Sequence, residues 1–238
     1  MLKIIAEGHD GTYTFSQLLE IMRVLRGPEG CPWDREQTHS SIRNDAIEEI
    51  YEVADAIDTQ DDAALCEELG DVLLQVVFHA QIAQEESSFT FDDVVDTVAK
   101  KLVLRHPHVF AENHVDSSGE VLDLWDSIKK EEKHQETFTD TLKSVPRAFP
   151  ALMRAAKLQK RAIKAGYSFD TVSVEDKLQA FQNANSAEEK FTAYGELLFV
   201  VAGLQNVIKI NAEEALGTAS DRFIDEFEKD EKSGKFSH

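Results

Sequence analysis

The order of apolar and polar residues predicts helices along almost the whole chain. Apolar side chains recur at spacings of three and four residues in long stretches, which is the period of an α-helix that buries one face. No stretch of useful length alternates between apolar and polar residues in the way a half-buried strand does. The pattern therefore predicts an all-α, bundle-like protein.

Local signals indicate where these helices begin and end. Thr14 with Gln17, and Ser186 with Glu189, have the spacing of a capping box, in which two side chains satisfy free backbone donors at a helix start. Gly166 is expected to close a helix. Helices are predicted at about residues 15–26, 40–57, 62–84, 91–105, 117–133 and 146–164, followed by three shorter helical patterns and a frayed, charged tail.

The sequence contains an internal repeat. The stretch GDVLLQVVFHAQI at residues 70–82 and the stretch GELLFVVAGLQNV at residues 195–207 nearly superpose in their apolar positions. Two related helical units in tandem are therefore expected, one at residues 1–135 and one at residues 136–238.

The helix predicted at residues 62–84 carries a narrow polar stripe. Its apolar residues lie nearly all the way around, which predicts a buried helix. Glu68, Asp71, Gln75 and His79 nevertheless follow one line along it. Buried carboxylates must be paired, protonated or bound to a cation. His79 is consistent with either a supporting role beside a metal or a satisfied buried histidine.

The preceding helix carries the acidic segment EEIYE at residues 48–52. Glu48, Glu49 and Glu52 lean to one side of the helix, where like charges cost about 0.2–0.5 kcal/mol per pair. Taken alone, this is an amphipathic helix with a solvated acidic face. A short connector makes the next helix an antiparallel neighbour, so that Glu49 and Glu52 can face Glu68 and Asp71. Four such carboxylates would suit Mg²⁺, with Mn²⁺ as a substitute.

Charge and cysteine content limit the partners. The chain has 45 acidic and 25 basic residues, a net charge of −20, which opposes binding to nucleic acid or to an anionic membrane. An anionic ligand therefore requires local cations. Cys31 and Cys66 form no disulfide framework and no CxxC motif. The first residues contain an apolar run that is too short for a signal peptide. No stretch approaches the ~18 apolar residues of a membrane span. A cytoplasmic protein is therefore expected.

These acidic segments also carry a family resemblance. The sequence IEEIYEVADAI, followed by EELGDVLLQVVFHAQ, has the EExxE…ExxD pattern and resembles the MazG family of nucleoside triphosphate pyrophosphohydrolases. GCPWDREQTH, KKLVLRHPHVF, WDSIKKEE and PALMRAAKLQKRA extend the resemblance over most of residues 15–170. It implies the all-α NTP pyrophosphatase fold, usually as a homodimer with two Mg²⁺. It also implies hydrolysis of a nucleoside triphosphate to a monophosphate and pyrophosphate.

The resemblance assigns expected roles to residues by position. Glu49, Glu52, Glu68 and Asp71 resemble the metal ligands, and Glu48 resembles a supporting residue that orients water.

Two other pairs of residues have expected roles in binding the substrate. Lys101 and Arg105 resemble the pair that binds the triphosphate, although cations at a solvated helix end are also favoured by the helix dipole. Trp33 and Trp125 are candidates for stacking on the base, and core or interface packing is the commoner role of tryptophan.

The second unit departs from the family pattern. Aligning Gly195 with Gly70 places Ala193 at the position of Glu68, and only Glu196 matches an acidic ligand. The first unit is therefore expected to carry the catalysis, and the second to support dimerisation. One alternative is a non-catalytic helical protein that binds nucleotides or a partner. Another is a di-iron bundle, which requires Glu-x-x-His pairs that these two acidic segments lack.

Overall fold

The computed structural model describes residues 12–111, 117, 119–121, 124, 125, 128, 137–169 and 173–236. All regular elements in these ranges are helices, as predicted. The chain forms two compact units, Met1–Val121 and Leu122–His238. The unit boundary predicted from the sequence, between residues 135 and 136, lies outside the described residues, and the roles expected for the two units stay predictions.

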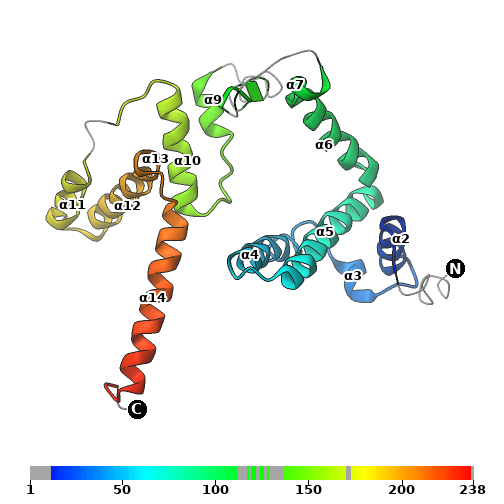
Figure 1. Ribbon diagram of the computed structural model, residues 1–238, viewed down its shortest axis with the longest axis horizontal. Coiled ribbons are helices and arrows are strands. Elements are labelled where there is room, and N and C mark those ends of the chain that lie inside the picture. The colour runs from blue at the N-terminus through cyan, green and yellow to red at the C-terminus, as the bar shows by residue number, and fades with distance from the viewer. Residues whose placement is uncertain are drawn as a thin grey trace. The chain divides into compact units, whose positions relative to one another are not determined.

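The first unit is organised around one long helix, α5 (Figure 1). α4 lies antiparallel to α5 after a connector of three residues, and α2 and α6 also pack on α5. The helices of this unit are α2 (Phe15–Leu25), α3 (Pro32–Glu36), α4 (Asp45–Asp58), α5 (Asp62–Glu85), α6 (Phe91–Arg105) and α7 (Pro107–Phe110).

The core of the first unit lies at the C-terminal half of α5. Val77, Phe78 and Ile82 of this helix pack with Met22 of α2 and with Ile42. The prediction that the whole helix is buried is wrong for one stripe of large apolar side chains in its N-terminal and middle turns, which is exposed. The reason is that α2 covers only the C-terminal half of α5 within this unit. The exposed residues are Leu69, Leu73 and Val76.

Capping fixes most helix ends of the first unit. The predicted capping box of Thr14 and Gln17 is present at α2, and Thr90 caps α6, which ends at Arg105 as expected. The helix expected from residue 40 begins only at Asp45, because Thr38 and Ser41 close a turn through hydrogen bonds between their side chains and backbone. A short helix, α3, occupies part of the predicted loop.

The second unit contains a similar hairpin, formed by α11 and α12, and α10 packs against α12. The predicted capping box of Ser186 and Glu189 starts α12. Gly166 adopts a φ of +89° after α10, as expected for a helix-closing glycine. The helices are α9 (Phe138–Lys143), α10 (Ala151–Lys164), α11 (Val174–Asn183), α12 (Ala187–Gly203), α13 (Gln205–Ile208) and α14 (Ala212–Lys232).

Three features of the second unit differ from the sequence prediction. The polar connector contains α9, which Thr137 caps together with Asp140. α10 begins at Ala151 and not at residue 146, because Pro150 disfavours a helical residue before it. The charged tail is not frayed but forms α14 up to Lys232. Most of the helix predicted at residues 117–133 lies outside the described residues; within it, Ser117 Oγ accepts a hydrogen bond from the Glu120 backbone N–H.

One stretch of the second unit passes a simple membrane criterion. The segment Ala187–Ile208 is long and apolar enough to cross a membrane by length and composition. The expectation that no stretch approaches this limit was therefore too strong. Core helices of soluble proteins pass the same test, and α12 packs against α10 and α11.

Candidate metal and nucleotide site

The hairpin of α4 and α5 is set by its connector. Residues 59–61 separate the helices, and Gln60 takes a left-handed φ of 56° that reverses the chain. The side chain of Asp61 then accepts hydrogen bonds from the backbone N–H groups of Ala63 and Ala64, both at 3.0 Å. This cap fixes where α5 begins, and so which of its side chains face α4.

The hairpin brings the predicted acidic residues together. Glu49 of α4 and Glu68 and Asp71 of α5 each offer one carboxylate oxygen, and these three atoms lie within 4.8 Å of one another. Glu52 lies near both Glu49 and Glu68, and it raises the pKa of each. The four residues are called the acidic cluster below. Glu49, Glu68 and Asp71 are half-buried, whereas Glu52 is exposed.

The electrostatics of the acidic cluster are unfavourable without a cation. Partial burial raises the pKa of Glu49, and Asp71, Glu52 and Glu68 raise it further. Burial likewise raises the pKa of Glu68, followed by the effect of Glu52 and Asp71. Within the described part of the chain, no lysine or arginine forms an ion pair with these carboxylates. Several hard oxygen donors with unbalanced charge fit a divalent metal ion such as Mg²⁺.

Glu48 lies beside the acidic cluster but is not a member of it. It sits in the first turn of α4 and is exposed. A residue in this place is free to hold a water molecule near the cluster, and this role stays a prediction.

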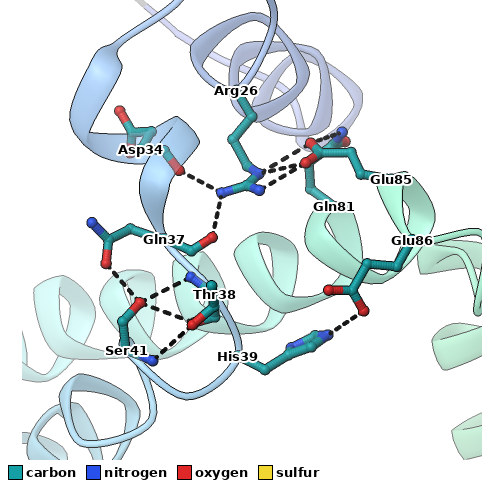
Figure 2. A network of polar contacts seen from close by, with 9 residues as sticks. All are labelled: Arg26, Asp34, Gln37, Thr38, His39, Ser41, Gln81, Glu85 and Glu86. Atoms are coloured by element: carbon teal, nitrogen blue, oxygen red, sulfur yellow. Dashed lines mark hydrogen bonds and ion pairs between the residues drawn. The ribbon is translucent and has the colours of Figure 1, made fainter.

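A loop precedes α4 and is held by one buried arginine, Arg26 (Figure 2). Its guanidinium donates to the Glu85 carboxylate and to the backbone carbonyls of Asp34 and Gln37. Only 6% of the Arg26 side chain is exposed. This arrangement was not predicted, because no local sequence pattern links residues 59 positions apart.

The same loop presents two of the residues noted in the sequence. Trp33 is 58% exposed and meets Phe78 edge-on, with ring centroids 6.5 Å apart. Its exposed face leaves room for stacking on a base, which stays a prediction. His79 contacts His39 of the loop, with 2.8 Å between their Nδ1 atoms, so it is a satisfied, half-buried histidine.

The remaining predicted residues lie on other elements. Lys101 and Arg105 are one turn apart on α6, and Lys101 is exposed. Trp125 is half-buried and belongs to the second unit. The predicted phosphate and base contacts of these three residues stay predictions.

Comparison with known proteins agrees with this geometry. The family model described as the MazG nucleotide pyrophosphohydrolase domain matches residues 37–110, which include the whole acidic cluster. The chain is 40% identical over 223 residues to the nucleoside triphosphate pyrophosphohydrolase/pyrophosphatase MazG of Thermotoga maritima, covering 92% of this chain and 86% of that protein.

A second relative is similar to the same extent. The chain is 43% identical over 230 residues to a nucleoside triphosphate pyrophosphohydrolase of Escherichia coli K12, covering 91% of this chain and 86% of that protein. A solved structure of a MazG-related protein from Thermotoga maritima aligns at 33% identity and a TM-score of 0.42, over 48% of this chain and 98% of that one. On its sequence similarity, this chain belongs to the MazG family of nucleoside triphosphate pyrophosphohydrolases.

Proposed function

We propose that this chain hydrolyses nucleoside triphosphates to nucleoside monophosphates and pyrophosphate, using Mg²⁺ bound to the acidic cluster. The observation that carries the proposal is the convergence of Glu49, Glu68 and Asp71 within 4.8 Å, with no ion pair to a lysine or arginine among the residues that the structure describes. Glu52, which raises the pKa of both Glu49 and Glu68, completes the ligand set. Mn²⁺ is a suitable substitute, because it also prefers oxygen ligands.

The chemistry requires charge neutralisation and a positioned water molecule. Water adds to the α-phosphorus. The bond between the α-phosphorus and the oxygen that bridges it to the β-phosphorus breaks, and this oxygen leaves as part of pyrophosphate. A bound divalent metal supplies charge neutralisation at the phosphates and lowers the pKa of a bound water. The protein residues hold the metal, while Glu48 at the edge of the cluster orients the attacking water.

Binding of an anionic substrate by a chain of net charge −20 requires placed cations. Lys101 and Arg105 point the same way from α6, and we assign them to the triphosphate. Arg grips phosphate oxygens bidentately, and Lys acts as a point charge. Trp33 is the favoured base contact, because its ring is exposed, and Trp125 is the secondary candidate.

The exposed apolar residues of the first unit support a homodimer. Leu69, Leu73 and Val76 form a stripe on α5, at the spacing with which helices pack together. A second stripe on α6 has the same spacing. Soluble monomers rarely leave such large apolar surfaces open, and we assign a second copy of the chain as the partner that covers them. The residues of the α6 stripe are Val95, Val98 and Leu102.

The test is a product analysis. The purified chain is incubated with Mg²⁺ and a panel of ribo- and deoxynucleoside triphosphates, and the products are separated by chromatography. We expect monophosphate and pyrophosphate, with loss of both on addition of EDTA and in the Glu52→Gln variant. Asp58→Asn, on the same helix but outside the acidic cluster, is the matched control and should retain activity.

Two results would contradict the proposal. One is cleavage between the β- and γ-phosphates. The other is intact triphosphate in folded protein with every substrate tested. The altered second unit, which retains only Glu196 of the acidic set, favours one alternative, namely a protein that binds nucleotides without turnover. In that case Glu52→Gln would leave partner or nucleotide binding unchanged.

A further inference from the structure

The two units contain hairpins of the same construction. In each, a connector of three residues separates two helices, and a side chain of the connector caps the second helix: Asp61 in the first unit and Ser186 in the second. Position 62 at the start of α5 corresponds to position 187 at the start of α12, and Gly70 corresponds to Gly195. Because the connectors are equally long, the same offset of 125 residues also relates α4 to α11.

This register identifies what stands at each position of the acidic cluster in the second unit. Val174 occupies the position of Glu49 and Ala193 that of Glu68, and both are half-buried like their counterparts. Glu196 occupies the position of Asp71. A lysine, Lys177, stands at the position of Glu52.

The lysine makes direct contact with the one remaining carboxylate. Nζ of Lys177 donates to Oε2 of Glu196 at 2.7 Å, across the hairpin from α11 to α12. In the first unit, Glu52 of α4 instead lies among three other carboxylates. The two hairpins thus differ in the sign of one charge at one position, and in the number of acids around it.

We propose that Lys177 is a tethered counter-ion that takes the place of the divalent metal in the second hairpin. That hairpin then needs no metal, and the chain binds divalent ions only at the acidic cluster of the first unit. The second part of this inference rests on the proposed function of the first unit. An ammonium group is a compact charge with three donors, and one such group balances a single carboxylate without any ion from solution.

The surroundings of Glu196 agree with this assignment. A carboxylate that is already paired with a lysine is a poor site for Mg²⁺, which keeps several waters and requires further oxygen ligands in near-octahedral geometry. The positions of Glu49 and Glu68 hold side chains without oxygen, Val174 and Ala193. Beside Ala193 and Glu196 lies an open pocket of about 540 Å³, which Glu188 and Glu189 also line. The carboxylate of Glu189 already accepts hydrogen bonds from the backbone N–H groups of Asn185 and Ser186. The pocket leaves room for a longer acidic side chain at position 193.

The experiment is a titration with Mn²⁺ alone, followed by calorimetry, on three full-length proteins. The first is the unchanged chain. The second carries Glu68→Gln and Asp71→Asn, which remove the first cluster. The third adds Val174→Glu, Lys177→Glu and Ala193→Glu to the second protein, which restores four acids in the second unit. Circular dichroism confirms that each protein is helical.

We expect the unchanged chain to bind Mn²⁺, the second protein to lose all saturable binding, and the third to regain it. A matched control replaces the three restoring changes by Lys190→Glu, at an exposed lysine of α12, and should regain nothing. Saturable binding in the second protein that is removed by Glu196→Gln would overturn the inference. So would a folded third protein that binds no Mn²⁺.

The failure of the proposed function gives a different result. If the unchanged chain binds no Mn²⁺, the first unit is not a metal site, while the third protein still decides whether Lys177 stands in for a metal. As a second readout, the third protein with Lys177→Arg in place of Lys177→Glu should bind no Mn²⁺, because it keeps the positive charge beside Glu196.

Discussion

Arg26, just after α2, is bound to Glu85, the last residue of α5, with 2.7 Å between Nη2 and Oε2. The same guanidinium donates to carbonyls of the loop before α4 and lies 5.3 Å above the ring of Phe78. One side chain thus joins two helices and the loop that leads to the acidic cluster. Its donors are directed to several acceptors at once, which only the planar guanidinium fork allows.

Replacing Arg26 should destabilise the protein markedly. Arg26→Ala leaves two loop carbonyls without their donor and Glu85 without its partner, which should lower the free energy of unfolding by about 2–4 kcal/mol. Arg26→Lys should rescue only part, because an ammonium cannot reach all three acceptors. Urea unfolding followed by circular dichroism measures the loss. The control is Arg23→Ala, which breaks an exposed ion pair with Glu20 on the same helix and should change little; equal losses would refute the assignment.

Two glycines of α12 should respond oppositely to alanine. A Cβ at Gly203 would overlap the side-chain amide of Gln159, which is buried and donates to the Phe199 carbonyl at 2.5 Å. Gly203→Ala should therefore cost about 1–3 kcal/mol. A Cβ at Gly195 meets nothing within 4 Å, and Gly195→Ala should stabilise the helix by up to about 1 kcal/mol. Thermal unfolding of both variants measures these two effects. A Gly203→Ala variant that is more stable than the unchanged chain would contradict the predicted overlap with Gln159.

Removing one carboxylate of the acidic cluster should make the metal-free protein more stable and should abolish the stabilisation by Mg²⁺. Without metal, Glu68→Gln relieves repulsion from Glu52 and Asp71, so the melting temperature in EDTA should rise. With Mg²⁺ at 100 times its dissociation constant, the unchanged chain should gain about 2.7 kcal/mol, and the variant should gain almost none. Melting curves with and without Mg²⁺ test this. A variant that is less stable in EDTA and keeps the full metal response would contradict the assignment of the acidic cluster as the metal site.

The contact of His79 with His39 should make stability depend on pH. Burial lowers the pKa of His79 below its ordinary value of 6.5, and His39 lowers it further. The unfolded chain therefore takes up a proton near pH 6.5 that the folded protein resists. The stability contributed by neutral His79 is complete above this pH and is lost as the pH falls through it.

The measurement compares urea unfolding at pH 7.5 and pH 5.5 for the unchanged chain and for His79→Gln. Other charged groups nearby, such as Glu86 at 3.9 Å from His39, are common to both proteins, so the difference between them reports His79. We expect the unchanged chain to lose more stability on acidification. Equal losses would show that His79 is not held neutral by the fold.

The apolar stripe on α6 should control assembly. Val98 is 50% exposed between Val95 and Leu102, and a lysine there would place a charge in the proposed interface. Val98→Lys should therefore sediment as a monomer under conditions in which the unchanged chain is a dimer. Thr97→Lys, at an exposed position next to the stripe, adds the same charge and should leave the dimer intact. A dimer in both variants would place the interface elsewhere.

The sequence alone determined the helices that carry the site, because their signals are local. Thr90 and Ser186 cap helices within three residues of themselves, and the three-residue spacing from Glu49 to Glu52 and from Glu68 to Asp71 puts each pair on one helix face. A short connector then leaves an antiparallel hairpin as the simplest arrangement. For these reasons the convergence of the acidic cluster could be predicted from the sequence without knowledge of the tertiary structure.

Only the tertiary structure decided which groups meet across longer separations. The pairing of Arg26 with Glu85 and the half-exposed α5 depend on where α2 packs, which no local pattern encodes. From the sequence alone, Lys177 is indistinguishable from any other charged residue on a helix. Only the folded hairpin shows that it forms an ion pair with Glu196. Capping and periodicity act over a few residues, whereas packing selects among many surfaces of similar hydrophobicity, and the partners of individual charges follow from that selection.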